Sequence, residues 1–252
     1  MGIGLECALA FARQGARCVL TYKWGTAQEG DVRARFSEIE APAPEIIRAD
    51  AGNDEDTTTL IQHLRSITDS VEVFVSNVSA ALVVGDLKDY SRKALFRSIE
   101  YSAWPMFEYT FRLFECFGKY PRYVIGMSST GVETYAQGYD FMAASKAVME
   151  TLCRYLDYRL RGNDVRVNVV RTCNLRTLAL QETFGKEFEK FAARFAREEH
   201  YIEPTEVAGV VLALASGLLD GVSGQILTVD RGICFFDNIM RIYDERERLG
   251  LT

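Results

Sequence analysis

Short apolar runs alternate with longer helical patterns along almost the whole chain, and this alternation most constrains the fold. The four clearest runs are nearly continuous in apolar residues, as strands covered on both faces should be; they are residues 71–77, 122–129, 165–172 and 224–230. Two shorter runs come earlier, at 16–22 and 45–50. Helical patterns lie between them, including long ones at about 92–116 and 139–160. Such strand–helix–strand repeats predict an α/β fold, a doubly wound parallel sheet with helices on both faces.

Polar side chains stand where these expected strands end. In doubly wound sheets, ligands bind beyond the carboxyl ends of the strands. The sequence therefore predicts a ligand site formed by the residues at these ends, which are Asp50, Ser76, Asn77, Ser128, Ser129 and Thr172.

Size and charge narrow the classes of function. No polar or Pro/Gly-rich linker divides the 252 residues, so we expect one domain over residues 1–252. A net charge of −6 is not typical of proteins that bind nucleic acid or anionic membranes. No apolar run approaches the roughly 20 residues that span a bilayer, and the first residues lack a signal-peptide pattern. We expect a cytoplasmic protein with neither nucleic acid nor membrane as a partner.

The cysteines and histidines do not have the spacing of metal ligands. None of the six cysteines forms a C-x-x-C pair, and none pairs at ligand spacing with His63 or His200. We therefore expect no metal site and six reduced cysteines.

A set of short motifs follows the alternating pattern in a fixed order. They are "GIG" at 2–4, "RAD" at 48–50, "SN" at 76–77, "MSS" at 127–129, Tyr139 with Lys146, "RVNVV" at 166–170 and "GQILTVDRG" at 224–232. In this order they resemble the short-chain dehydrogenase/reductase superfamily over nearly the whole chain. The resemblance implies a Rossmann-like fold and an NAD(P)H-dependent oxidoreductase.

The spacing of Tyr139 and Lys146 narrows the resemblance to one branch. Most members of the superfamily have Tyr-x3-Lys, but here six residues separate the two. This spacing is similar to that of the enoyl-acyl carrier protein reductases. Residues seven apart on a helix lie two turns away on almost the same stripe, so both side chains can face one pocket.

These residue types suit the reduction of an acyl thioester. A phenol can stabilise the negative charge that builds on the substrate oxygen, and we expect the Lys146 ammonium to lower the pKa of Tyr139. Ser129 is a third catalytic candidate, because its hydroxyl can bond the same oxygen; Ser128 and Tyr135 are candidates for the substrate pocket. The alternatives are a packed core tyrosine, a solvated lysine and a serine that caps a strand.

The resemblance also implies a cofactor site. It places the pyrophosphate at the helix opened by Gly2, Ile3 and Gly4, the adenine at Asp50, and the nicotinamide ribose at Lys146. Lys23 stands where an NAD-specific member carries an acidic residue, so a cation there favours the 2′-phosphate of NADPH over NADH. Lys23 can equally be a surface lysine. Three further residues are expected to line the cofactor site, Ala51, Asn77 and Thr177; Thr177 can instead be a helix N-cap.

Two apolar segments lie outside this site. Four phenylalanines between 184 and 195 share one helical face, which either anchors a helix to the core or forms a substrate lid over residues 176–200; Phe184 and Phe188 are the candidates to touch an acyl chain. The segment 233–252 is apolar enough to expose a patch on a monomer. We expect it to pack on a neighbouring subunit of a homodimer or homotetramer, or to cover the site.

The sequence also departs from the superfamily pattern. The first strand and the rest of the glycine-rich turn have no counterpart before Gly2, so we expect a truncated sheet. Three explanations stay open: the sequence starts inside a longer natural protein, another segment fills the gap, or the cofactor site is defective. On the long helix, Glu100 replaces the usual asparagine, which the enoyl reductases also lack.

Three functions therefore compete. The first is an NADPH-dependent reductase of enoyl thioesters carried by acyl carrier protein or coenzyme A, in fatty acid or polyketide biosynthesis. The second is a β-ketoacyl or polyketide ketoreductase. The third, from a different class, is a non-catalytic partner subunit, which the missing nucleotide turn motivates.

Overall fold

The sheet is parallel throughout but divided in two. The structure, a computed structural model, describes all residues except 1, 24–27, 81, 174–177 and 252, and does not describe the side chains of 178–184, 186 and 189. Four strands form one sheet in the order β3 (Val73–Ser76), β4 (Tyr123–Ser129), β5 (Arg166–Thr172) and β6 (Ile226–Val229). A separate pair consists of β1 (Val19–Tyr22) and β2 (Glu45–Arg48). The predicted parallel α/β fold is confirmed.

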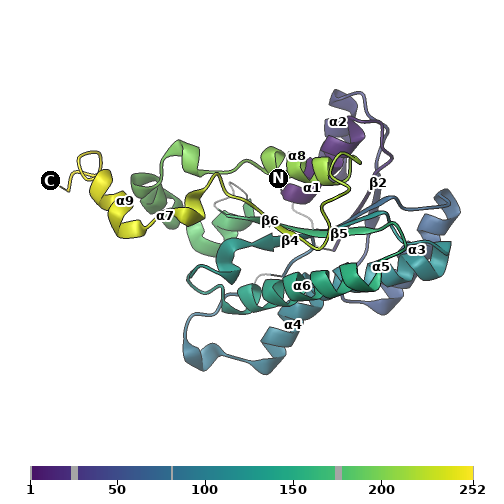
Figure 1. The fold of residues 1–252 in the computed structure, drawn as a ribbon, viewed down its shortest axis with the longest axis horizontal. Coiled ribbons are helices and arrows are strands. Elements are labelled where there is room, and N and C mark those ends of the chain that lie inside the picture. The colour runs from purple at the N-terminus through teal and green to yellow at the C-terminus, as the bar shows by residue number, and fades with distance from the viewer. Residues whose placement is uncertain (1, 24–27, 81, 174–177, 252) are drawn as a thin grey trace.

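Helices cover both faces of the two parallel sheets (Figure 1). On one face lie α1 (Ile3–Ala12), α2 (Glu29–Glu38) and α8 (Pro204–Leu214); on the other lie α3 (Asp54–Ile67), α4 (Arg92–Ser102), α5 (Trp104–Phe117) and α6 (Asp140–Arg159). Because both faces are covered, β4 and β5 are almost wholly buried, and Val124, Val167 and Val169 have no exposed surface. This burial is why the central strands read as unbroken apolar runs.

The strand register brings the polar strand ends together. Ser129 at the end of β4 lies opposite Thr172 at the end of β5, and Thr172 lies opposite Val229 in β6. Ser76 at the end of β3 pairs with Gly126 in β4. The predicted convergence of strand ends at one edge of the sheet is confirmed.

The long helix predicted at 92–116 is two helices. A break at Ala103 separates α4 from α5, and Pro105 occupies the first turn of α5. Proline lacks an N–H and clashes with the preceding turn, so it starts a helix more readily than it continues one. Glu100, which stands where most members of the superfamily have an asparagine, lies on α4 with its side chain exposed. Its carboxylate is therefore not buried.

The predicted gap in the sheet lies between β1 and β3. In the described part of the chain, no strand pairs with the second edge of either one. The two sheets therefore meet at an opening rather than at a shared ladder. That the opening results from truncation stays a prediction.

The predicted lid region and tail lie together at one end of the molecule (Figure 1). The helix α7 (Leu178–Phe195) is interrupted at Gly185, whose φ of 80° suits glycine. The tail contains the short helix α9 (Asn238–Asp244), and the guanidinium groups of Arg241 and Arg248 donate to the carbonyl of Phe195. These bonds satisfy the carboxyl end of α7.

The apolar side chains of the tail are exposed. Phe235 is 93% exposed, and Ile239, Met240 and Tyr243 are also open to solvent. That a neighbouring subunit covers them stays a prediction. None of the described helices is long and apolar enough to cross a membrane.

Candidate active site

A large cavity opens at the carboxyl ends of the strands. Its volume is about 1580 Å³. It is lined by nearly all of the residues that the sequence singled out, which are Gly2, Ile3, Gly4, Lys23, Asp50, Ala51, Asn77, Ser128, Ser129, Tyr135, Tyr139, Lys146 and Phe188. Thr177 lies outside the described residues, as does the side chain of Phe184. The cavity therefore brings together segments that are more than a hundred residues apart in the sequence.

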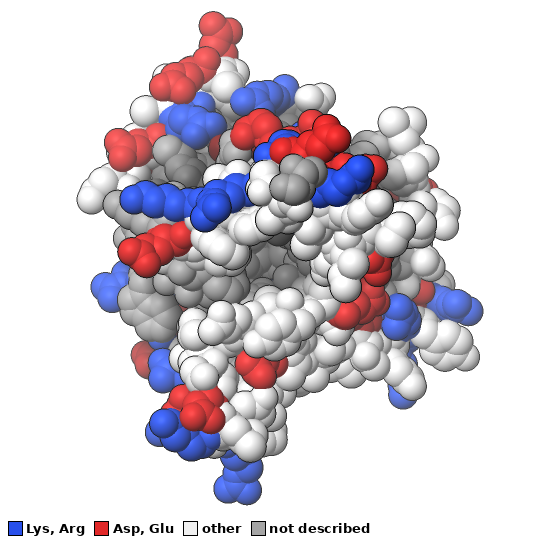
Figure 2. Space-filling view, turned by 90° about the vertical axis from the view of Figure 1, so that its left-hand side faces the viewer, with Lys and Arg blue, Asp and Glu red and all other residues white. Residues whose placement is uncertain are grey.

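The face seen in Figure 2 has a hollow near its centre that is bordered mostly by uncharged side chains. Lys, Arg, Asp and Glu side chains gather above the hollow, with both signs mixed (Figure 2). Among the described residues of this face, Lys and Arg therefore do not form one continuous patch of a single sign.

Tyr139 is positioned by the turn that opens α6. Gly138 has a positive φ of 70°, and the backbone N–H of Tyr139 donates to the carbonyl of Ala136 over 3.2 Å. The Tyr139 ring packs directly on Gly131. A Cβ added to Gly131 would lie 2.6 Å from the Cδ1 atom of Tyr139. Burial raises the pKa of Tyr139, and a hydrogen bond with Ser129 partly offsets that rise. The phenol is therefore protonated at neutral pH and is available as a donor.

Tyr139 is the N-cap residue of α6, and Lys146 lies two turns into that helix and lines the same cavity. It is only 5% exposed, and its Nζ donates to the carbonyl of Met127 over 2.7 Å and to that of Ser102 over 3.4 Å. Burial lowers its pKa to about 8, and the nearby Glu150 opposes that shift.

The expectation that Lys146 lowers the pKa of Tyr139 is wrong for this arrangement. The pKa of Tyr139 is raised by burial, and only Ser129 acts against the rise. The physical reason is that the lysine ammonium is held at two backbone carbonyls rather than at the phenol.

The two candidate serines have different partners. The Ser129 hydroxyl interacts with Tyr139 and accepts from the backbone N–H of Gly131 over 3.3 Å. The Ser128 hydroxyl is buried and donates to Glu150 Oε1 over 2.6 Å. Ser129 is thus the serine beside the phenol, whereas Ser128 belongs to a second polar group.

That second group is a buried ion pair which the sequence did not predict. Arg171 on β5 donates to both carboxylate oxygens of Glu150 on α6, over 3.0 and 2.5 Å. A third bond of 2.7 Å joins Arg171 to Glu133, which is exposed. Hydrogen bonds with Glu150 raise the pKa of Arg171. The pair links β5 to α6, the helix that carries Tyr139 and Lys146.

A polar cluster lies at the ends of β1 and β2. Lys23 forms an ion pair with Asp50 and donates to the hydroxyl of Tyr101 over 2.9 Å. Asp50 also accepts from the backbone N–H of Gly52. Burial alone would raise the pKa of Asp50, but the hydrogen bonds from Lys23 and Gly52 hold it below its usual value. The sequence did not predict Tyr101 as a member of this cluster, because no motif marks it. Only the fold brings α4, which carries Tyr101, to the ends of β1 and β2.

The residues present suit a dinucleotide with an anionic pyrophosphate. Gly2 is the N-cap of α1 without a side-chain cap, so the first backbone N–H groups of the helix have no capping partner and border the cavity. Gly2 has open space beside it. Gly4 lies so close to Asn77 that a Cβ added to Gly4 would lie 2.7 Å from the Nδ2 atom of Asn77. Lys23 and Lys146 line the same cavity. A nicotinamide cofactor fits this set of donors.

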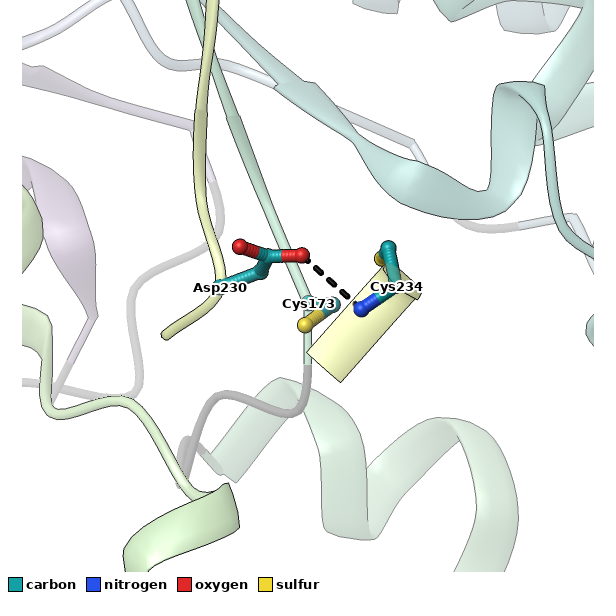
Figure 3. Close-up of side chains that lie close together, drawn as sticks. All are labelled: Cys173, Asp230 and Cys234. Atoms are coloured by element: carbon teal, nitrogen blue, oxygen red, sulfur yellow. Dashed lines mark hydrogen bonds between the residues drawn. The ribbon is translucent and has the colours of Figure 1, made fainter. Parts of the chain in front are cut away.

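Among the described residues, one cluster has the composition of a metal site (Figure 3). The ligand atoms of Cys173, Asp230 and Cys234 lie within 4.8 Å of one another. The Asp230 carboxylate already accepts from the backbone N–H groups of Gly232 and Cys234. Burial raises the pKa of Cys173 to about 12, so its thiol is neutral. These features do not favour metal binding, and the expected absence of a metal stays a prediction.

The arrangement defines a class of enzyme. A parallel α/β sheet, a ligand cavity at its carboxyl edge, and a tyrosine and lysine on one helix facing that cavity are typical of short-chain, nicotinamide-dependent oxidoreductases. A family model described as enoyl-(acyl carrier protein) reductase matches residues 1–234. The chain belongs to this family of the short-chain dehydrogenase/reductase superfamily, and it is an NAD(P)H-dependent oxidoreductase.

Individual relatives are distant but cover nearly the whole chain. The NADH-dependent enoyl-acyl-carrier-protein reductase of Aquifex aeolicus is 22% identical over 98% of this chain and 90% of its own. The NADPH-dependent enzyme of Staphylococcus aureus is also 22% identical, over 92% of this chain and 94% of its own. Among solved structures, an actinorhodin polyketide ketoreductase with NADPH matches with a TM-score of 0.81 and 20% identity, over 93% of this chain and 94% of that one. These structural likenesses concern the fold.

Proposed function

We propose that this chain reduces the carbon–carbon double bond of an enoyl thioester, carried by acyl carrier protein or coenzyme A, with NADPH. The observation that carries the proposal is the position of Tyr139 and Lys146, which lie seven residues apart on one helix region and line one cavity. The matching family model and the relatives that are named enoyl-acyl-carrier-protein reductases support it.

The chain's own residues would act on the thioester oxygen. A reduced nicotinamide, when bound, supplies a hydride. Negative charge then builds on the thioester oxygen, and the protonated hydroxyl of Tyr139 stabilises it by donating a hydrogen bond. Ser129 orients that hydroxyl, since the two side chains are hydrogen-bonded. Lys146 holds a positive charge in the buried part of the cavity, where electrostatic interactions are stronger than in water.

The predicted lid remains part of this proposal. Phe188, Ala192 and Ala196 line the cavity, and the first two lie on α7. A helix that turns apolar side chains towards the cavity suits an acyl chain better than a polar substrate. Tyr135 also borders the cavity but is 90% exposed, so it would lie at the mouth.

The substrate class is tested by comparing two thioesters. We expect NADPH oxidation with crotonyl-coenzyme A and little with acetoacetyl-coenzyme A. The reverse preference would support the ketoreductase alternative, which the hydrogen bond between Ser129 and Tyr139 favours, because two hydroxyls can bind one carbonyl oxygen. Turnover of neither thioester would contradict both.

Lys23 is the residue on which the preference for NADPH depends. Replacing it with alanine is expected to raise the Kd for NADPH about tenfold, or about 1.4 kcal/mol, and to leave NADH binding unchanged. The reason is the loss of a cation that can pair with the 2′-phosphate. Cofactor fluorescence measures both affinities. Lys88→Ala is the matched control, because Lys88 is also a lysine but lies on an exposed turn outside the cavity lining. Equal losses in both variants would contradict the role of Lys23.

The pH dependence of turnover should report Lys146. Its pKa is lowered to about 8, so its charge is present at neutral pH and is lost as the pH rises through that value. We expect kcat/KM to fall about tenfold per pH unit on this alkaline limb. The limb is not expected from Tyr139, because its pKa is raised above the ordinary phenol value. In Lys146→Arg, which stays charged, the limb should disappear although the rate is lower. A limb that persists in this variant would assign it to another group.

A further inference from the structure

Two consecutive residues near the end of β4 hold two successive turns of α6. The carbonyl of Met127 accepts from Lys146 Nζ over 2.7 Å. The hydroxyl of the next residue, Ser128, donates to Glu150 Oε1 over 2.6 Å. Glu150 stands four residues after Lys146 on α6, and side chains four apart on a helix are neighbours on one face. The Glu150 carboxylate and the Lys146 ammonium therefore share the face of α6 that packs on β4.

The Glu150 carboxylate is fixed from two strands at once. Arg171 on β5 donates to both of its oxygens, and Arg171 lies directly opposite Ser128 in the ladder between β4 and β5. Glu150 is only 5% exposed, and Ser128 and Arg171 are also buried. Because three hydrogen bonds hold its two oxygens, the place of the carboxylate relative to Lys146 is set by the sheet.

Glu150 acts on the candidate site from outside the cavity. Lys146 lines the cavity, but neither Glu150 nor Arg171 is among the described residues that do. Any effect of Glu150 on the reaction must therefore pass through Lys146. Burial disfavours the charged form of Lys146 and lowers its pKa to about 8, and the carboxylate of Glu150 opposes that loss of charge.

We propose that Glu150 is a positioning residue of the reaction: fixed by Ser128 and Arg171, its carboxylate keeps the ammonium of Lys146 charged in a site whose burial disfavours charge. The importance of that charge for turnover rests on the proposed function, whereas the effect of Glu150 on Lys146 does not. Without the Glu150 carboxylate, Lys146 becomes the neutral amine at a lower pH.

The other titratable or charged groups that face this pair differ in what they contribute; they are Tyr139, Cys153, Arg171 and Glu133. Burial raises the pKa of both the phenol and the thiol, so both are neutral near the pKa of Lys146. The guanidinium and the exposed Glu133 carboxylate are bound to each other. The groups of α4 and β4 that accept from Lys146 are backbone carbonyls, which do not titrate. Glu150 is therefore the group whose loss should shift the titration of Lys146.

The test measures the charge of Lys146 directly and also in turnover. In the full chain labelled with 13C and 15N, the side-chain signal of Lys146 is assigned by its loss in Lys146→Arg and followed by NMR as the pH is raised. In Glu150→Gln, the midpoint of this titration should fall by at least about half a pH unit, because a nearby opposite charge is lost. The alkaline limb of kcat/KM should move to lower pH by the same amount.

Two controls separate the charge of Glu150 from a change in fold. In the double variant Glu150→Leu with Arg171→Met, no buried charge is left unpaired, and the midpoint should again fall, because Glu150 is the charge that opposes the burial of Lys146. Glu115→Gln, on the exposed surface of α5, should leave both the midpoint and the limb unchanged.

The outcomes for Glu150 and for the proposed function are distinguishable. An unchanged NMR midpoint in either Glu150 variant would overturn the inference, as would a lowered midpoint with an unmoved alkaline limb. If the unsubstituted chain reduced neither thioester, the proposed function would fail. The NMR titration would then decide by itself whether Glu150 sets the charge of Lys146.

Discussion

Replacing Tyr139 with phenylalanine is expected to lower kcat/KM by about 10²- to 10⁴-fold while NADPH binding changes little. The ring would still pack on Gly131, so the fold of the turn should be kept. What is lost is the buried, protonated hydroxyl that would stabilise charge on the thioester oxygen. Steady-state kinetics and cofactor fluorescence measure the two quantities separately.

Tyr135→Phe is the matched control for this prediction. Tyr135 lines the same cavity, but its side chain is 90% exposed and lies outside the Ser129–Tyr139 pair. Removal of its hydroxyl should change kcat/KM less than about threefold, since exposed hydrogen bonds contribute little. If Tyr139→Phe turned over as fast as the unmodified protein, the proposed role of Tyr139 would be wrong. The partner-subunit hypothesis would then regain support.

Replacing Arg171 with methionine is expected to destabilise the fold by about 3–5 kcal/mol. The substitution removes both guanidinium hydrogen bonds from the buried carboxylate of Glu150, which keeps the Ser128 hydroxyl as its described hydrogen-bond partner and the Lys146 ammonium as a nearby charge. An uncompensated buried charge is much more costly than the loss of an exposed ion pair. Urea unfolding at neutral pH measures the difference in the free energy of unfolding.

Two further variants test the cause of that loss. In the double variant Glu150→Leu with Arg171→Met, both charges are removed, and much of the stability should return. Arg231→Met breaks an exposed pair with Glu206, of 2.7 Å in the structure, and should cost less than about 1 kcal/mol. If Arg171→Met and Arg231→Met were equally destabilising, burial of Glu150 would not be the cause.

The local sequence pattern was sufficient to predict several features of the fold and of the candidate site. The parallel strands, the edge at which their polar ends meet and the shared stripe of Tyr139 and Lys146 all follow from periodicity. Periodicity records which faces are buried, and burial sets the residue types. The break between α4 and α5 was also readable in principle, because Pro105 marks it.

Other features depend on partners that are distant in sequence. Nothing near Ser128 indicates that it binds Glu150, or that Ser129 rather than Ser128 lies beside Tyr139. Burial raises the pKa of Tyr139, and the Lys146 ammonium does not oppose the rise because it donates to the carbonyls of Met127 and Ser102 instead. These contacts arise only when helix and strands are packed together.

The sequence by itself determined the class of fold and the edge of the sheet that carries the candidate site, because both depend on the spacing of side chains along single helices and strands. The tyrosine–lysine pair was singled out by its resemblance to the short-chain reductases. Tertiary structure alone decided the partners of Lys23 and the buried Glu150–Arg171 pair. Each of these is a contact between elements far apart in the chain, and such contacts are fixed by packing rather than by pattern.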